Sequence, residues 1–86
     1  MKLIFAEQAW QDYLYWQLRD KKILKKINTL IKEIKKIPFE GTGSPEPLRH
    51  HWSGFWSRRI TREHRLVYSV DEGQILIAQC RYHYES

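Results

Sequence analysis

The sequence predicts an α+β fold in which two N-terminal helices pack on one face of a small, mostly antiparallel, twisted sheet. Two observations support this class. Apolar side chains recur at helical spacing in the first 40 residues, whereas residues 55–84 are rich in the branched and aromatic residues typical of strands. Between them, residues 39–47 contain two glycines and two prolines, which indicates a loop too short to separate domains. We therefore expect a single domain over residues 1–86.

The first half contains one short strand and two helices. Leu3–Phe5 is apolar and is predicted to be the strand, and Glu7–Leu18 carries its apolar residues on one helical face. Asp20 is the expected N-cap of a second helix over Lys21–Ile37, because its carboxylate can accept hydrogen bonds from free backbone N–H groups. The apolar residues of this helix fall within an arc of roughly 120°, with lysines opposite. Pro38 ends the helix.

The second half contains three predicted strands, Phe55–Ile60, His64–Val70 and Gln74–Tyr84. The connectors Thr61–Glu63 and Asp71–Gly73 are short, which predicts hairpins and hence antiparallel pairing.

The register of the hairpins decides which side chains share a face, because successive side chains alternate across a strand. With a three-residue first connector, Ile60 pairs with His64, and Arg59 then lies directly opposite Arg65. With a three-residue second connector, Val70 pairs with Gln74. The predicted polar face holds Ser57, Arg59, Arg65, Val67, Ser69, Gln79, Arg81 and His83. The predicted helix-packing face holds Trp56, Ile60, Leu66, Tyr68, Val70, Leu76, Ala78, Cys80 and Tyr82.

Two arginines that face each other across a strand pair repel, so the pairing of Arg59 with Arg65 favours an anion between them. The charge distribution agrees. The net charge is +5, residues 1–40 hold eight lysines and one arginine, and residues 41–86 hold six arginines and no lysine. Because guanidinium groups are suited to phosphate, the second half is where an anionic partner such as nucleic acid is expected.

The same composition argues against a membrane protein and a secreted protein. No apolar run is long enough to cross a bilayer, and the N-terminus lacks the apolar core of a secretory signal. The single Cys80 cannot form an internal disulfide. We therefore expect a cytoplasmic setting and no membrane partner.

The second half also contains the side chains that metal-independent RNA cleavage requires. A base must deprotonate the ribose 2′-OH, a cation must stabilise the phosphate, and an acid must protonate the leaving 5′-oxygen. Glu46, between two prolines, is a candidate base, and His83 is a candidate acid. Arg59 and Arg65 could clamp the phosphate. The four histidines and one cysteine lack the spacing of a metal site, so no metal or cofactor is expected.

Other interpretations of these residues stay open at this point. A loop glutamate such as Glu46 is more often simply solvated, and the arginines could form salt bridges to Glu63 or Glu72. The chain could then be a non-catalytic nucleic-acid-binding module, such as a DNA-bound co-repressor. It could also be an interaction protein whose basic face binds an acidic partner.

Several runs of residues together resemble the YoeB family of RelE-like ribonuclease toxins. The resemblance covers essentially the whole chain in order. It is carried by Met-Lys-Leu-Ile (1–4), Asp-Tyr-Leu-Tyr-Trp-Gln (12–17), Pro-Phe-Glu-Gly (38–41), Pro-Glu-Pro-Leu (45–48), Ser-Gly-Phe-Trp-Ser-Arg-Arg-Ile (53–60), Glu-His-Arg-Leu-Val-Tyr (63–68) and Cys-Arg-Tyr-His-Tyr (80–84).

The resemblance implies a RelE-like fold and a toxin that cleaves mRNA in the A site of the 70S ribosome. It also implies a homodimer that is neutralised by a YefM-type antitoxin. By the same resemblance, Glu46 is the general base, Arg65 stabilises the phosphate with Arg59 as a second cation, and His83 is the general acid. Tyr84 matches the aromatic residue at the C-terminal end of the family.

One further position, Arg49, is a candidate for binding the substrate phosphate. The family usually has a lysine where this chain has Arg49. Arginine keeps the positive charge but not the compact ammonium, so the resemblance supports phosphate binding at this position and argues against proton transfer.

Overall fold

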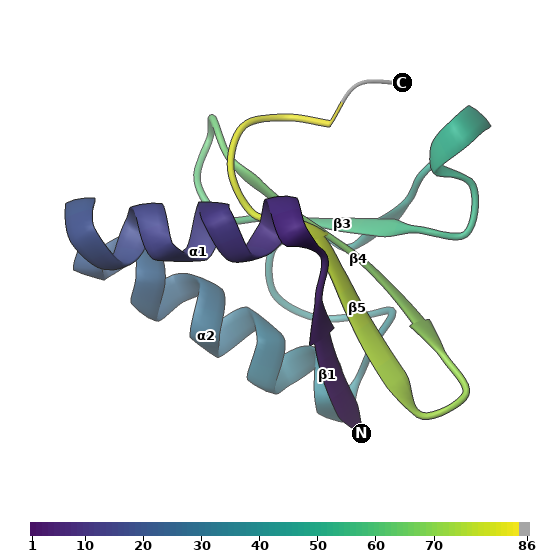
Figure 1. Ribbon diagram of the computed structural model, residues 1–86. Coiled ribbons are helices and arrows are strands. Elements are labelled where there is room, and N and C mark those ends of the chain that lie inside the picture. The colour runs from purple at the N-terminus through teal and green to yellow at the C-terminus, as the bar shows by residue number, and fades with distance from the viewer. Residues whose placement is uncertain (85–86) are drawn as a thin grey trace.

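The computed structural model describes residues 1–84 and contains a five-stranded sheet in the order β1-β5-β4-β3-β2 (Figure 1). Strand β1 runs parallel to β5, and every other neighbouring pair is antiparallel. Residues 85 and 86, the end of the predicted domain, lie outside the described residues. The strands are β1 (Lys2–Phe5), β2 (Glu46–Pro47), β3 (Trp56–Arg59), β4 (Arg65–Asp71) and β5 (Gln74–Gln79).

Both predicted helices form, and they lie side by side on one face of the sheet (Figure 1). Helix α1 covers Glu7–Arg19 and helix α2 covers Lys21–Lys36. The Asp20 carboxylate accepts hydrogen bonds from the backbone N–H groups of Lys22 and Ile23, at 3.0 and 3.2 Å, which confirms it as the N-cap of α2. The apolar faces of the helices meet the sheet in a core that includes Ala9, Ile27, Leu30, Ile34, Leu66, Tyr68, Ile75 and Ile77. The predicted α+β class is confirmed.

The segment between α2 and β3 is more ordered than the predicted loop. Its residues Glu46–Pro47 form β2, where Glu46 is the register partner of Ser57 on β3. A single 3₁₀ turn, η1 (His50–Trp52), follows before the chain returns to β3.

The first hairpin has the predicted register. Arg59 pairs with Arg65, and the backbone N–H of Ile60 donates to the carbonyl of His64 at 2.9 Å. The two arginines therefore start from adjacent positions of neighbouring strands.

The second hairpin differs from the prediction by one residue. Val70 pairs with Ile75, not with Gln74, because the turn consists of only two residues, Glu72 and Gly73. Both have positive φ, 46° and 75°, as a tight hairpin turn requires. The shift makes Ile75 and Ile77 the fully buried residues of β5, so the predicted core positions Leu76 and Ala78 were wrong.

An irregularity further along the same strand pair reverses this shift. The register changes between Val67 and Tyr68, so that Val67 is the partner of Gln79. This bulge returns Gln79 to the face of Val67, as predicted, and it leaves Cys80 fully buried.

The last predicted strand was too long. Strand β5 ends at Gln79 because side chains of α1 bind the backbone of Cys80: Asp12 accepts from its N–H at 3.0 Å, and the Trp16 indole donates to its carbonyl at 2.8 Å. Tyr82, predicted to be buried, is 58% exposed and has a φ of 62°. Residues 80–84 therefore leave the sheet as a separate C-terminal segment.

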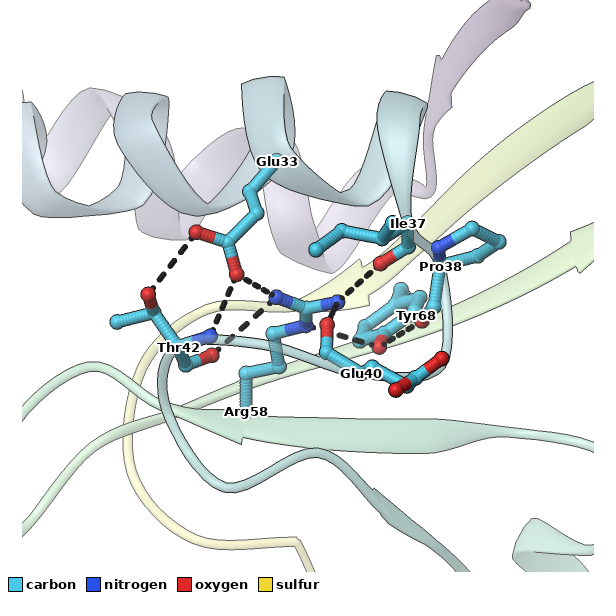
Figure 2. Close-up of polar contacts among 7 residues, drawn as sticks. All are labelled: Glu33, Ile37, Pro38, Glu40, Thr42, Arg58 and Tyr68. Carbon is cyan, nitrogen blue, oxygen red and sulfur yellow. Dashed lines mark hydrogen bonds and ion pairs between the residues drawn. The ribbon is translucent and has the colours of Figure 1, made fainter.

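Arg58, for which the sequence pattern predicted no role, is fully buried and lies at the junction of β3, α2 and the following loop (Figure 2). All five of its N–H donors have acceptors. The acceptors are the Glu33 carboxylate at 2.7 Å, the Tyr68 hydroxyl, and the carbonyls of Ile37, Glu40 and Thr42. This network fixes the loop that leads from α2 to β2.

Candidate active site

Five of the six predicted site residues line one cavity of about 200 Å³, which we call the central cavity. They come from β2, from the facing strands β3 and β4, and from the C-terminal segment. The members are Glu46, Arg59, Arg65, His83 and Tyr84, together with Gly43, Ser44 and Ser57. The polar face expected from strand alternation and the Pro-flanked loop acid therefore meet, which the sequence alone could not establish.

Glu46 is held in place by its backbone surroundings. It lies on β2 opposite Ser57, and Leu48, two residues later, donates its N–H to the carbonyl of Phe55 at 2.9 Å. Glu46 is an exposed residue that lines the cavity. Its position is thus set by strand pairing, with the side chain left accessible to a substrate.

The loop before Glu46 is anchored at two points. The carbonyl of Gly43 accepts from the N–H of Arg59 at 2.7 Å. Gly43 has a φ of 88°, and a Cβ there would lie 3.0 Å from the Arg59 carbonyl oxygen, so glycine suits this close approach. Upstream, Thr42 donates its N–H and its hydroxyl to Glu33, whose pKa is lowered mainly by these bonds and further by Arg58 (Figure 2).

The two arginines of the central cavity are held differently. Arg59 is exposed, whereas Arg65 is half-buried and donates from Nη1 to the carbonyls of Thr61, Arg62 and His64 at 2.8 to 3.1 Å. Neither arginine forms an ion pair with a carboxylate within residues 1–84. Two unpaired guanidinium groups at one cavity create a site with positive potential that is suited to a phosphate.

The C-terminal segment is fixed by contacts with β4 and β5. The carbonyl of Tyr82 accepts from the N–H of Arg65 at 3.0 Å, and the N–H of Tyr82 donates to Nδ1 of His64 at 2.7 Å. The Gln79 amide donates to the carbonyl of His83 at 3.1 Å. These bonds place His83 beside the arginines even though β5 has ended.

His64 can accept this bond only in its neutral form. Its ring packs edge-on against Trp16, with 4.8 Å between centroids. Burial is the main cause of a lowered His64 pKa, and the charges of Arg81, His83 and Arg65 add to it. The fold thus favours the state of His64 that holds Tyr82.

Tyr84 reaches the candidate base directly, since its hydroxyl donates to a Glu46 carboxylate oxygen at 3.4 Å. The exit of the chain from the sheet turns Tyr84 toward the site, whereas continued strand alternation through residue 84 would place it on the core side with Tyr82. Arg49, the sixth predicted residue, lies in a neighbouring cavity of about 280 Å³ with Glu46, His50 and Tyr84. We call this the Arg49 cavity.

A third and larger cavity, of about 540 Å³, is also lined by His83, and we call it the Arg81 cavity. It is formed by α1, η1, the end of β5 and the C-terminal segment, and no sequence pattern predicted it. Its lining includes Gln8, His51, Trp52, Arg81 and His83. Buried N–H donors at Trp52 Nε1 and Arg81 Nε have no hydrogen-bond partner among residues 1–84.

Residues 1–84 contain no group of three or more His, Cys, Asp or Glu side chains placed to hold a metal ion. No helix in this part of the chain has the length and apolar character needed to cross a membrane.

Comparisons with known proteins define the class of this chain. A family profile described as "YoeB-like toxin of bacterial type II toxin-antitoxin system" matches residues 5–84. The toxin YoeB of Escherichia coli K12 is 67% identical over 84 residues, which span 98% of this chain and all of that protein. The chain therefore falls among the toxins of bacterial type II toxin–antitoxin systems. Within that class, it belongs to the YoeB family.

Solved structures agree with this assignment. The YoeB/ParE toxin from Agrobacterium tumefaciens is 48% identical with a TM-score of 0.94, covering 98% of this chain and 100% of that chain. The YoeB dimer from Staphylococcus aureus is 50% identical with a TM-score of 0.92, covering 98% of each chain. A YoeB–YefM complex from the same organism is 49% identical with a TM-score of 0.91, again covering 98% of each chain. The predicted RelE-like fold is confirmed by these neighbours.

Proposed function

We propose that this toxin is a metal-independent endoribonuclease that cleaves mRNA in the ribosomal A site and so inhibits translation. The observation that carries the proposal is the central cavity, where a carboxylate, two arginines and an imidazole share a space of about 200 Å³. These are the three kinds of group needed for attack of a 2′-OH on the adjacent phosphodiester.

Glu46 takes the proton from the 2′-OH, and the resulting oxygen attacks the phosphorus. The P–O5′ bond then breaks as His83 gives a proton to the leaving oxygen. The products are an RNA ending in a 2′,3′-cyclic phosphate and an RNA beginning with a 5′-hydroxyl. Tyr84, which donates to Glu46 at 3.4 Å, helps to position the carboxylate and the substrate.

Arg65 and Arg59 stabilise the negative charge that grows on the phosphate oxygens. Their charges are free for this task, because neither is paired with a carboxylate within residues 1–84. Arg65 is the more rigid of the two, since three carbonyls of its own turn fix Nη1. Arg49, in the adjoining cavity, binds a neighbouring phosphate.

The proposed partners are mRNA, the 70S ribosome, a second copy of the chain and a YefM-type antitoxin. The net charge of +5 favours association with RNA and with an acidic antitoxin. The dimer and antitoxin proposals rest on the YoeB dimer and the YoeB–YefM complex of S. aureus. A ribosomal substrate places this activity in the cytoplasm.

The direct test is single-turnover cleavage of a ribosome-bound message, with both new RNA ends identified. Glu46→Gln and His83→Ala should each slow cleavage by about 10²–10⁴-fold. The matched control is Glu40→Gln, because Glu40 is an exposed acid on the same loop and lies outside the central cavity. New ends that carry a 3′-hydroxyl and a 5′-phosphate would contradict the proposal, because attack by the 2′-OH cannot produce them.

A non-catalytic nucleic-acid-binding function would give a different pattern. RNA binding would then depend on Arg59 and Arg65, whereas Glu46→Gln and His83→Ala would behave as wild type. Expression of the wild-type chain without antitoxin should also arrest growth, and both variants should relieve that arrest.

A further inference from the structure

Two cavities share lining residues with the central cavity, one through Glu46 and the other through His83, and they indicate the direction in which RNA crosses the site. In the proposed reaction the base lies beside the ribose 5′ of the scissile phosphate, and the acid lies beside the ribose 3′ of it. Glu46 lines the central cavity and the Arg49 cavity, whereas His83 lines the central cavity and the Arg81 cavity. The path from Glu46 to His83 therefore runs from 5′ to 3′ and ends in the Arg81 cavity.

We propose that the Arg81 cavity binds the nucleotide immediately 3′ of the scissile phosphate, with Arg81 and Trp52 recognising its base. This inference rests on the proposed nuclease function and adds a binding site to it. At about 540 Å³, the cavity is the largest of those described and leaves ample room for a nucleotide.

Arg81 is built for recognition of an acceptor-rich ligand. Its guanidinium carbon lies 3.5 Å from the ring centroid of Tyr15 and 4.5 Å from that of Tyr82, so two aromatic rings hold it. The Arg81 side chain makes no ion pair and donates no hydrogen bond within residues 1–84, and its Nε is buried. A rigid guanidinium without a partner binds planar acceptor groups such as base edges with little loss of entropy.

Trp52 supplies a second donor and a stacking surface. Its indole N–H is buried without an acceptor, a state that costs free energy until a ligand provides one. The ring is held edge-on by Phe55, with 5.2 Å between centroids, and His51 lies beside it. Aromatic rings next to a guanidinium are the common platform for single-stranded RNA bases.

The test compares Arg81→Gln with Arg19→Gln. Both arginines stack on Tyr15, with Arg19 5.2 Å from its centroid, and both changes remove one positive charge, but Arg19 does not line the cavity. Ribosomes are programmed with an intact message, with a message that is abasic 3′ of the cut, or with one that is abasic 5′ of it. Single-turnover cleavage rates are measured for each protein, and thermal unfolding shows that each variant is folded.

The wild type and Arg19→Gln should cleave the 3′-abasic message about 10-fold more slowly than the intact message. Arg81→Gln should cleave the intact message about 10-fold more slowly but lose only about 2-fold further on the 3′-abasic one. Trp52→Phe, which keeps a ring and removes the N–H, should also lose less rate than the wild type on the 3′-abasic message. The loss of rate on the 5′-abasic message should be the same in all four proteins.

Three results would overturn the inference. The loss of cleavage rate caused by the 3′-abasic site could be as large in Arg81→Gln as in the wild type. The Arg81→Gln change could instead reduce the loss caused by the 5′-abasic site. Alternatively, Arg81→Gln could leave cleavage intact while weakening the complex with antitoxin, which would make the cavity a peptide site. Failure of the wild type to cleave the intact message is a separate outcome, because it removes the nuclease proposal itself.

Discussion

Replacing Arg58 with methionine tests the network that holds the loop in front of the central cavity. Arg58 is fully buried, and its five N–H groups donate to five oxygens, including one of Glu33 at 2.7 Å (Figure 2). Methionine fills much of the same space but provides none of these donors. The change therefore isolates the polar contribution of the side chain.

The expected loss of unfolding free energy is about 3 kcal/mol. Breaking a buried ion pair on one side costs roughly 3–5 kcal/mol. The lower end applies because Glu33 is 24% exposed and the loop carbonyls of Glu40 and Thr42 belong to exposed residues, so water replaces part of what is lost. For a chain of this size, that loss lowers the melting temperature by about 12–24 °C.

Chemical denaturation at neutral pH measures this loss directly. Arg62→Met is the control, because it makes the same replacement at an exposed arginine and should change stability by less than about 0.5 kcal/mol. A loss below about 1 kcal/mol for Arg58→Met, with an unchanged m-value, would refute the reasoning.

Two further predictions concern pH. Because the pKa of Glu33 is lowered in the fold, its carboxylate stabilises the fold at pH values above its ordinary pKa of 4.5, and this contribution is lost as the pH falls below that value. In denaturation measured at several pH values, the unfolding free energy of Glu33→Gln should therefore fall less on acidification than that of the wild type. The lowered pKa of His64 likewise gives stability that is complete above its ordinary 6.5 and is lost on acidification. His64→Asn, which keeps an acceptor for the Tyr82 N–H, should retain cleavage and lose this pH dependence, whereas His64→Phe should cleave about 10-fold more slowly. Equal cleavage by both His64 variants would contradict the role of this bond.

The parts of the structure that could be predicted from the sequence depend on local patterns. The spacing of Ile27, Leu30 and Ile34 defined the buried face of α2, and Asp20 capped it as its side chain allows. The facing of Arg59 and Arg65 followed from the length of one connector. Each of these features depends on residues close together in the chain.

The parts that could not be predicted depend on contacts between distant residues. The two-residue turn at Glu72 and Gly73 and the bulge beside Val67 shift the register in opposite directions, and neither has a distinct sequence signal. The end of β5 is set by Asp12 and Trp16, which are more than 60 residues away in sequence. Tertiary contacts of this kind decide where the C-terminal segment goes.

Arg58 is an intermediate case. Strand alternation places it on the helix-packing face, where an arginine requires an acid partner. That alternation was a usable signal of a buried ion pair. The identity of the partner, Glu33, follows only from how α2 crosses the sheet.

The central claim is that Glu46 is the general base and His83 the general acid, and the chemistry of the leaving group tests it most directly. A message with sulfur in place of the bridging 5′-oxygen releases a thiolate, which leaves without being protonated. His83→Ala should cleave the natural message about 10²–10⁴-fold more slowly than the wild type and should approach the wild-type rate on the sulfur message. Glu46→Gln should stay slow on both. Equal defects of His83→Ala on the two messages would contradict its role as the acid.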